Sequence, residues 1–437
     1  MSEDAEVRLW GQKIGAVSLE EGAQATVFQY DPAFAGSGIQ VSPLTMPLRK
    51  EPYTFPALAH ESFKGLPGLL ADSLPDKYGN ALINIWLARQ GREPESANAI
   101  ERLCYTGTRG MGALEFAPVK GPRSPRDKDI RIGALVDLAS EILSQRDGFA
   151  TSLRGGEAED GLRQILSVGI SAGGARAKAV IAWNPETGIV RSGQVAAEPG
   201  YEHWLLKFDG VGGNRDKETL DDPEGYGAIE YAYSMMAAAA GVVMSKCRLF
   251  EENGRRHFIT RRFDRPGPDD KLHMQSLAGL THFDFNQAGA YSYEQALMTI
   301  RRLGLSMADV EQQFRRMAFN VIARNQDDHV KNIAFLMNQG GDWSLSPAFD
   351  VTYAYQPGGA WTDQHQMSLN GKRDGFTIDD FERCAEVASM KRGRAKQIVS
   401  EVREAVSNWP AHAAEAGVPE SDIERIARAH RLDIPRA

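Results

Sequence analysis

Short stretches of alternating apolar and polar residues open the chain. Residues 7–10 and 14–19 alternate in this way on either side of Gly11-Gln12, and this pattern predicts a β-hairpin. Residues 25–30 have the same character and predict a third strand. Farther along, residues 77–90 place apolar side chains at helical spacing, which predicts an amphipathic helix. The first part of the chain is therefore expected to be rich in β-structure and to carry at least one helix.

The middle of the chain combines short apolar runs with turn residues. One helix is predicted at 130–145 and another at 226–240. Between them, apolar runs predict strands at 165–168, 177–183, 189–195 and 203–208. A glycine-rich run, 169–174, joins the first two of these strands. The pattern therefore predicts a small sheet followed by one helix.

Beyond about residue 240 the apolar positions follow helical spacing, with one interruption at 333–350. Helices are predicted at 291–304, 307–324, 378–407 and 420–430. Residues 118–128 hold three prolines and many charges and are the best candidate for a linker. We therefore expect an α+β protein with a β-rich N-terminal subdomain at 1–120, a small sheet lobe with the glycine-rich loop at 129–240, and a mainly helical lobe at 241–437.

Composition narrows the possible functions. The 50 Lys and Arg residues against 58 Asp and Glu residues give a formal charge of −8, which disfavours tight non-specific binding to nucleic acid. Cys104, Cys247 and Cys384 form no C-x-x-C pair, so neither a disulfide framework nor a cysteine zinc site is expected. The first residues do not resemble a signal peptide, and the longest nearly apolar run, 231–244, is too short to span a bilayer. We expect a cytoplasmic protein that does not contact the membrane.

A polar loop at 325–332 follows the helix predicted at 307–324. An apolar strand, a glycine-containing turn and a second strand come next, ending at Asp350. Because Asn332 and Asp350 are equally far from Gly341, a simple hairpin would return Asp350 beside Asn332. The sequence thus predicts that one amide and one carboxylate lie together at the end of a hairpin.

These residue types suit phosphoryl transfer. Asn332 and Asp350 offer the hard oxygen ligands that Mg²⁺ prefers. Asp327, five residues before Asn332, can orient an attacking hydroxyl, and Lys331 can offset charge on the phosphoryl group. This layout matches the catalytic loop and metal-binding Asp of protein kinases. For the spacing alone, a solvated polar loop that caps a helix is the better explanation. The predicted return of the hairpin to Asp350 makes the two interpretations about equal, so both stay open.

Two further features fit nucleotide binding but have simpler explanations. The run at 169–174 can place backbone N–H groups on phosphates, yet Ala175-Arg176 replaces the Lys-Ser/Thr of a P-loop, and a plain tight turn is the alternative. Lys207 lies in the middle of the strand predicted at 203–208. Such a lysine either extends to solvent at a sheet edge or contacts nucleotide phosphates in the small lobe of a kinase.

At the level of motifs, the chain resembles the HipA family of type II toxin–antitoxin kinases. Five stretches are similar to family motifs: 171–178 (SAGGARAK) to Ser-x-x-Gly-Ala-Gln-x-Lys, 203–207 (HWLLK) to His-x-x-Lys, 262–265 (RFDR) to R-F-D-R, 327–332 (DDHVKN) to D-x-H-x-K-N, and 345–350 (LSPAFD) to L-[ST]-P-x-[YF]-D. The N-terminal pieces VRLWGQKIGAVSL, FQYDPAF, GLLADSLPD and YTGTRGMGALEF are also similar. The resemblance covers about residues 7 to 400, in family order.

This resemblance implies a two-lobed, protein-kinase-like α+β fold with a β-rich N-terminal subdomain peculiar to the family, and ATP with Mg²⁺ as phosphoryl donor. Asp327 and Lys331 would be catalytic, and Asn332 and Asp350 would bind the metal. Ser171 would be the site of autophosphorylation. The residues implied to contact the nucleotide are Gly173, Gly174, Ala175, Arg176, Lys178, Lys207 and His329.

The family also implies substrates and a partner. Substrates are serine residues on proteins, in known cases aminoacyl-tRNA synthetases, and the partner is a helix-turn-helix antitoxin (HipB-like) that binds operator DNA. Nucleic acid would then be reached only through the antitoxin. The chain departs from the family at Arg176, which replaces Gln, at Ala177, which replaces an acidic residue, and at 272–276, where an acidic pair is missing.

Two other functions stay open. The departures favour a kinase-fold binding module, weak in catalysis, that acts with a DNA-binding partner in repression. A metal-dependent hydrolase built on Asp327, Asp328, His329 and Asp350 is the third hypothesis, and it leaves the glycine-rich run and Lys207 unexplained. We read His273 and His329 as packing or hydrogen-bonding residues, since neither has a partner at zinc-ligand spacing.

Overall fold

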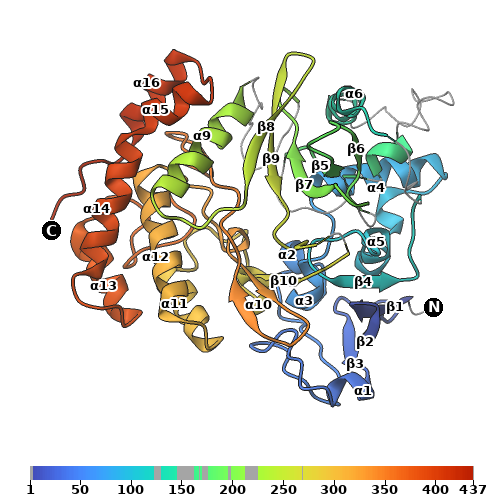
Figure 1. Ribbon diagram of the computed structural model, residues 1–437. Helices are drawn as coiled ribbons and strands as arrows, with labels where there is room; N and C mark the ends of the chain where they lie inside the picture. Colours follow the sequence, from blue (N-terminus) through green and yellow to red (C-terminus); the bar gives the residue numbers. More distant parts are fainter. Residues whose placement is uncertain are drawn as a thin grey trace. The chain divides into compact units, whose positions relative to one another are not determined.

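The computed structural model describes residues 3–122, 129–144, 162–166, 168–169, 176–194, 198–211, 225–267 and 269–436 (Figure 1). The chain divides into two compact units. The first comprises Met1–Glu224, Phe250–Gln275 and Leu336–Asp342, and the second comprises Gly225–Leu249, Ser276–Phe335 and Trp343–Ala437.

A four-stranded antiparallel sheet begins the first unit. Its strands are β1 (Glu3–Leu9), β2 (Gln12–Leu19), β3 (Val27–Tyr30) and β4 (Leu114–Ala117), in the order β3-β2-β1-β4. Trp10 (φ 51°) and Gly11 (φ 78°) form the tight turn between β1 and β2, with the positive φ angles that two-residue hairpin turns require. The predicted hairpin and third strand are confirmed.

The helices of the first unit are α1 (Pro32–Ala35), α2 (His60–Phe63), α3 (Gly68–Ala71), α4 (Lys77–Arg89), α5 (Ala99–Thr106) and α6 (Ile132–Ser144). A short 3₁₀ helix, Pro94–Ser96, precedes α5. The helix predicted at 77–90 is confirmed as α4, where the Asp76 carboxylate accepts the Gly79 N–H and so caps the first turn. The helix predicted at 130–145 is confirmed as α6.

A five-stranded sheet follows. It contains β5 (Lys178–Trp183), β6 (Val190–Ser192), β7 (Glu202–Lys207), β8 (Cys247–Glu252) and β9 (Arg255–Arg261), in the order β6-β5-β7-β9-β8. The strands predicted at 177–183, 189–195 and 203–208 are confirmed as β5, β6 and β7, although β6 is shorter than predicted. Apolar side chains of this sheet pack with those of α4 and α6 into one core that includes Ile181, Trp204, Ile259, Leu82 and Val136.

Two of the sequence predictions for this region are wrong. Residues 162–166 are helical, and residue 168 lies in a turn, where a strand was predicted at 165–168. A short apolar run does not by itself distinguish helix from strand. The helical pattern predicted beyond residue 240 also missed β8 and β9. Asn253 (φ 50°) and Gly254 (φ 78°) join these strands, and Asn-Gly between alternating residues is a strong hairpin signal.

The strands β10 (His273–Ser276), β11 (Ala334–Met337) and β12 (Trp343–Leu345) form a third sheet in that order. The hairpin predicted at 333–350 is confirmed as β11 and β12, but its predicted register is wrong. The Asn338 N–H donates to Asp342 O (3.1 Å), and the Ser346 N–H donates to Ala334 O (3.0 Å), so the pairing is centred on residue 340. Continued, this register would bring residue 348, two residues before Asp350, opposite Asn332.

The second unit is mainly helical. Its helices are α9 (Tyr226–Ala239), α10 (Leu277–Thr281), α11 (Tyr293–Arg302), α12 (Met307–Ile322), α13 (Ile378–Val387), α14 (Arg394–Ser407), α15 (Trp409–Glu415) and α16 (Glu420–Ala429), with a 3₁₀ turn at Val330–Asn332. In Figure 1, α12 lies beside α11 and α14, and α9 packs against α14 and α15. The buried face of α12, with Phe314, Met317 and Val321, provides the centre of this helical core.

Most helices of the second unit match their predictions. Those predicted at 226–240, 291–304, 307–324 and 420–430 are confirmed as α9, α11, α12 and α16. The stretch 378–407 is two helices, α13 and α14, because the backbone turns through positive φ at Ser389 (58°) and Gly393 (83°). Among the described residues, no helix has the length and apolar character needed to cross a membrane.

Candidate active site

Asp327 lies in the loop that follows α12. The indole Nε1–H of Trp361 donates to its Oδ1 at 2.6 Å. The side-chain Nδ2 of Asn332 donates to the main-chain oxygen of Asp327 at 2.8 Å and so closes the loop on itself. The Asp327 side chain is 45% exposed. Its carboxylate is therefore held on one side and remains accessible to a substrate on the other.

Phe285 forms an aromatic surface beside this loop. The Nζ of Lys331 lies 4.6 Å from the centre of its ring, in cation–π contact, and the His329 ring centre lies 6.2 Å from it. The Nε2 of His329 lies 3.9 Å from Asp327 Oδ1. The side chains of Lys331 and His329, two of the predicted site residues, thus lie against the ring of Phe285. The sequence analysis did not identify Phe285.

Asp328, next to Asp327, is buried and anchors the loop. Its Oδ2 accepts hydrogen bonds from the Tyr293 hydroxyl and from His365 Nδ1 (2.7 Å), and its Oδ1 accepts the Gln366 N–H (2.7 Å). Burial raises the pKa of Asp328, but the His365 contact and the three hydrogen bonds outweigh burial and hold that pKa below its ordinary value. Arg431 donates to His365 Nε2 at 2.9 Å and so fixes the proton of His365 on Nδ1.

Because its oxygens already accept these bonds inside the core, Asp328 is poorly suited to bind a metal ion. The hydrolase hypothesis, which used Asp328 together with Asp327, His329 and Asp350, thus loses one of its four proposed residues. Within the described part of the chain, no group of three or more His, Cys, Asp or Glu side chains is arranged to hold a metal ion.

Asn332 and Asp350 offer oxygen donors of the kind that Mg²⁺ binds. Since the Asn332 amide nitrogen is used in the bond to Asp327, its oxygen is the atom left to coordinate. Asp350 follows β12 in the left-handed region (φ 52°), a conformation that costs a non-glycine residue about 1–2 kcal/mol. Such strain often marks a functional position. Two protein donors fit an ion that takes its remaining ligands from phosphate and water.

Lys178 and Lys207 lie in the first unit, directly opposite each other on β5 and β7. Both are buried, with 2% and 8% of their surface exposed. Lys178 Nζ lies 3.8 Å from Asp76 Oδ2, and Lys207 Nζ lies 5.7 Å from the centre of the Phe258 ring. Because β7 is flanked by β5 and β9, Lys207 is not at a sheet edge, and the edge explanation for this lysine is wrong. Opposite residues share one face of a sheet, so two ammonium groups are buried on the same face.

The remaining predicted site residues belong to the glycine-rich segment. Arg176 is described and half-buried, and it lies two residues before the start of β5. Ser171, Gly173, Gly174 and Ala175 lie outside the described residues.

The R-F-D-R stretch forms a buried ion cluster in the first unit. Asp264 accepts hydrogen bonds from Arg262 (2.9 and 2.7 Å), from Arg265 (2.7 Å) and from the Gly112 N–H (2.7 Å). Both arginines also donate to the Gly110 carbonyl oxygen, at 3.2 and 3.1 Å. Burial raises the pKa of Asp264, but the two guanidinium groups outweigh it and hold that pKa well below its ordinary value. This motif therefore fastens the turn before β4 to the strand end after β9.

The segment at 272–276, which departs from the family pattern, is used for packing. His273 is fully buried, and its Nε2 lies 3.0 Å from Val41 O. Burial lowers the pKa of His273 to about 4, which keeps the ring neutral. Gln275 Nε2 donates to Ser42 Oγ at 3.3 Å. The reading of His273 as a packing and hydrogen-bonding residue is confirmed.

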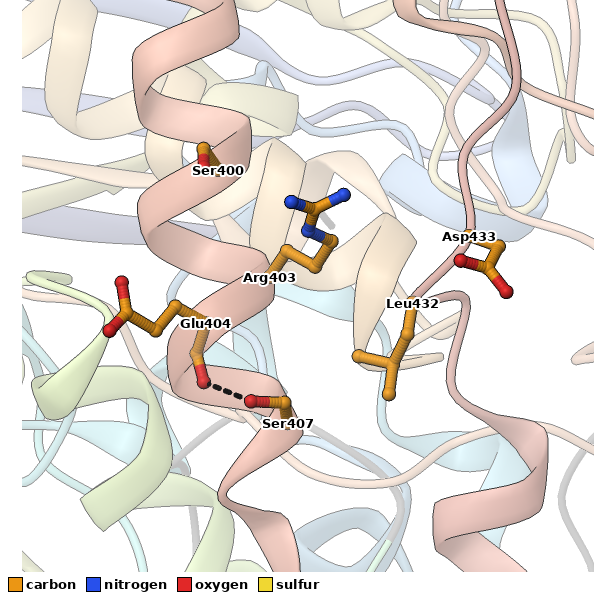
Figure 2. Close-up of a pocket in the computed structure, with 6 residues that line it drawn as sticks. All are labelled: Ser400, Arg403, Glu404, Ser407, Leu432 and Asp433. Carbon is orange, nitrogen blue, oxygen red and sulfur yellow. Dashed lines mark hydrogen bonds between the residues drawn. The ribbon is translucent and has the colours of Figure 1, made fainter.

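A surface hollow of about 440 Å³ lies beside α14. Figure 2 shows the side chains that line it. It is lined by Ser400, Arg403, Glu404, Ser407, Leu432 and Asp433. The lining is of mixed charge and mostly exposed, and it includes none of the predicted site residues. One internal hydrogen bond, from Ser407 Oγ to Glu404 O (2.6 Å), closes the end of the helix and needs no ligand.

Comparison with known proteins places the chain in a family. It matches the HipA N-terminal domain over residues 5–117 and the HipA-like C-terminal domain over residues 170–409. The protein belongs to the HipA family. The predicted family resemblance is thereby confirmed.

A solved structure has the same fold. HipA from Shewanella oneidensis MR-1, solved in a complex with HipB and operator DNA, matches with a TM-score of 0.66 and 15% identity, covering 97% of this chain and 94% of that one. The proinflammatory kinase CtkA of Helicobacter pylori matches with a TM-score of 0.31 and 9% identity, covering 56% of this chain and 92% of that one. No curated protein matches with significance. The predicted α+β fold of the HipA type is confirmed, and the three-part division into 1–120, 129–240 and 241–437 stays a prediction.

Proposed function

We propose that the protein is an ATP- and Mg²⁺-dependent protein serine/threonine kinase and the toxin of a toxin–antitoxin pair. Membership of the HipA family supports a kinase of the toxin type. The observation that carries the proposal is the arrangement at Asp327: an accessible carboxylate, fixed by Trp361 on one side, in a loop closed by Asn332. A solvated loop that merely caps α12 needs none of these contacts.

In the proposed reaction, the substrate hydroxyl attacks the γ-phosphorus of ATP while its proton passes to Asp327. A bond forms between the hydroxyl oxygen and phosphorus, the bond to the β–γ bridging oxygen breaks, and ADP leaves. Bound Mg²⁺, held by Asn332 and Asp350, would neutralise phosphate charge. Lys331 would offset the charge on the transferring group. Phosphoryl transfer depends mainly on such positioning and charge stabilisation.

Nucleotide contacts are proposed for residues of the first unit. The buried ammonium groups of Lys178 and Lys207 would contact phosphate oxygens, together with Arg176 and the glycine-rich segment. His329 would assist from the catalytic loop. Phosphate oxygens would be anionic partners for these two ammonium groups, in addition to the Asp76 carboxylate near Lys178.

The proposed biology follows the family. The substrate would be a serine or threonine on a host protein of the translation machinery, such as an aminoacyl-tRNA synthetase, in the cytoplasm. Ser171 would be autophosphorylated. The similar HipA from Shewanella oneidensis was solved with HipB and operator DNA, which supports a HipB-like helix-turn-helix antitoxin as partner and DNA contact only through it.

The test is transfer of labelled γ-phosphate from Mg·ATP, with the purified protein alone and with host lysate. Wild type is expected to label itself and one or a few lysate proteins. Ser171→Ala is expected to lose the self-label and keep the lysate label. No label under any condition, with ATP still bound, would contradict the kinase and favour the binding module. The departures at Arg176 and Ala177 are the observations that favour this second candidate.

Removal of the metal gives a second prediction. Excess chelator is expected to reduce label transfer to background, and added Mg²⁺ to restore it. Asn332→Ala and Asp350→Asn are expected to raise the Mg²⁺ concentration for half-maximal rate at least about 10-fold. Loss of even a residue that only hydrogen-bonds to a metal ligand weakens metal binding by about that factor. Asp342→Asn removes an exposed carboxylate at the tip of the same hairpin and is the matched control. Equal Mg²⁺ requirements in all variants would refute both ligand assignments.

A further inference from the structure

We propose that Trp361 is a positioning residue for the reaction. Its indole N–H holds Oδ1 of Asp327 and leaves Oδ2 to receive the proton of the substrate hydroxyl. The inference rests on the proposed kinase function and adds to it a residue that no motif of the sequence singled out.

Hydrogen bonds link the segment around Trp361 to the loop that contains Asp327. Gln366 Nε2 donates to the Trp361 carbonyl oxygen at 2.5 Å, and the Gln366 N–H donates to Asp328 Oδ1 at 2.7 Å. On the other side, Gln326 Nε2 donates to the carbonyl oxygen of Thr362 at 3.0 Å. Gln326 and Asp328 flank Asp327 in the sequence. The segment that presents the indole is therefore bonded to the residues before and after the proposed catalytic residue.

The two oxygens of Asp327 lie in different surroundings. Oδ1 accepts the Trp361 N–H at 2.6 Å and lies 3.9 Å from His329 Nε2. Among the described residues, no donor binds Oδ2. An indole nitrogen can only donate, so Oδ1 already accepts a hydrogen bond and Oδ2 is the oxygen left to accept the proton of the substrate hydroxyl.

This asymmetry matters because the reaction depends on geometry. A carboxylate turns freely about its last bond unless one oxygen is held, and misplacing a reacting group by about 1 Å can cost about 100-fold in rate. Among the described residues, the one hydrogen bond to the Asp327 side chain comes from Trp361. Its loss is expected to lower kcat more than it changes substrate binding.

Trp361→Phe removes the donor and keeps an aromatic ring. We expect kcat to fall about 10-fold. This is part of the rate enhancement of about 100- to 10,000-fold that a positioned general base contributes. The KM for ATP is expected to change less than about 2-fold, because the ring makes no proposed contact with nucleotide.

Two controls separate positioning from folding. Trp409→Phe removes another indole N–H, which donates to Ile423 O at 3.0 Å in the helical core, and is expected to lower thermal stability with kcat unchanged. In an Asp327→Asn background, Trp361→Phe is expected to leave the residual rate unchanged within about 2-fold, because residues that act as one unit are not additive. A purely structural role for Trp361 would lower the rate in both backgrounds.

The indole N–H resonance of Trp361 tests the contact without any catalysis. It is identified among the seven tryptophans as the signal missing in Trp361→Phe, and it is expected to move upfield in Asp327→Asn. An active wild type whose kcat is unchanged or raised by Trp361→Phe, or a resonance insensitive to Asp327, would overturn the inference. A wild type that transfers no phosphate, with the resonance sensitive to Asp327, would overturn the kinase proposal and with it any catalytic use of the contact.

Discussion

Replacing Asp327 by asparagine is expected to lower the rate of phosphoryl transfer about 1,000-fold, within the range that a positioned general base contributes. Asparagine keeps the shape of the side chain, and its Oδ1 can still accept the Trp361 N–H. It cannot take the proton of the attacking hydroxyl. Because the Asp327 side chain is 45% exposed, the free energy of unfolding is expected to change by less than about 0.5 kcal/mol. Single-turnover transfer of labelled phosphate and denaturant unfolding measure the two effects.

Asp328→Asn is the informative comparison, because it removes the neighbouring carboxylate. Asp328 is fully buried and binds Tyr293, His365 and Gln366, so its replacement is expected to destabilise the protein by about 1–3 kcal/mol. The two variants should therefore separate loss of chemistry from loss of stability. Transfer by Asp327→Asn at close to the parent rate would refute the assignment of Asp327.

Replacing Asp264 by asparagine is expected to cost about 3–5 kcal/mol of stability, the typical effect of removing one partner of a buried ion pair. The carboxylate binds Arg262, Arg265 and the Gly112 N–H, and its side chain is fully buried. Without it, two guanidinium groups stay in the core with no counter-charge from this position. The loss should appear as a lower midpoint of urea unfolding.

The pH dependence of this contribution has a definite sign. The pKa of Asp264 in the folded protein lies well below its ordinary value, because the two arginines outweigh the effect of burial. The stabilisation is therefore fully present above the unfolded pKa of about 3.9 and is lost as the pH falls toward the lower folded value. The difference in stability between wild type and Asp264→Asn should accordingly shrink in acid.

Asp269→Asn is the matched control for this prediction. Asp269 is exposed and lies only five residues away, so its replacement changes the net charge equally and is expected to alter stability by less than about 0.5 kcal/mol. Equal unfolding midpoints for the two variants would mean that the buried cluster does not stabilise the fold.

Much of the secondary structure could be predicted from the sequence, because its determinants are local. The alternation around Gly11-Gln12 predicts the β1–β2 hairpin, and the apolar spacing at 77–90 and 307–324 predicts α4 and α12. The failures were also local in origin. The run at 165–168 was too short to assign a period, and the Asn253-Gly254 turn signal between β8 and β9 was missed.

Part of the candidate site could also be predicted from the sequence, because some of its contacts are local. Asp327 and Asn332 lie five residues apart, and their contact closes a single loop, so the motif alone brings them together. The motifs also led to the HipA family, which the family matches confirm. The roles of these residues remain predictions that the kinetic tests address.

What the sequence alone determined was the set of local elements, the order of the motifs and the family. Only the tertiary structure showed that Trp361, 34 residues after Asp327, binds its carboxylate, that Tyr293 and His365 bind Asp328, and that the Gly112 N–H, 152 residues before Asp264, completes the buried cluster. The physical reason is the distance along the chain over which each kind of signal acts. Periodicity and turn residues act over a few positions of the chain, whereas a hydrogen bond between distant residues depends on how the whole core packs.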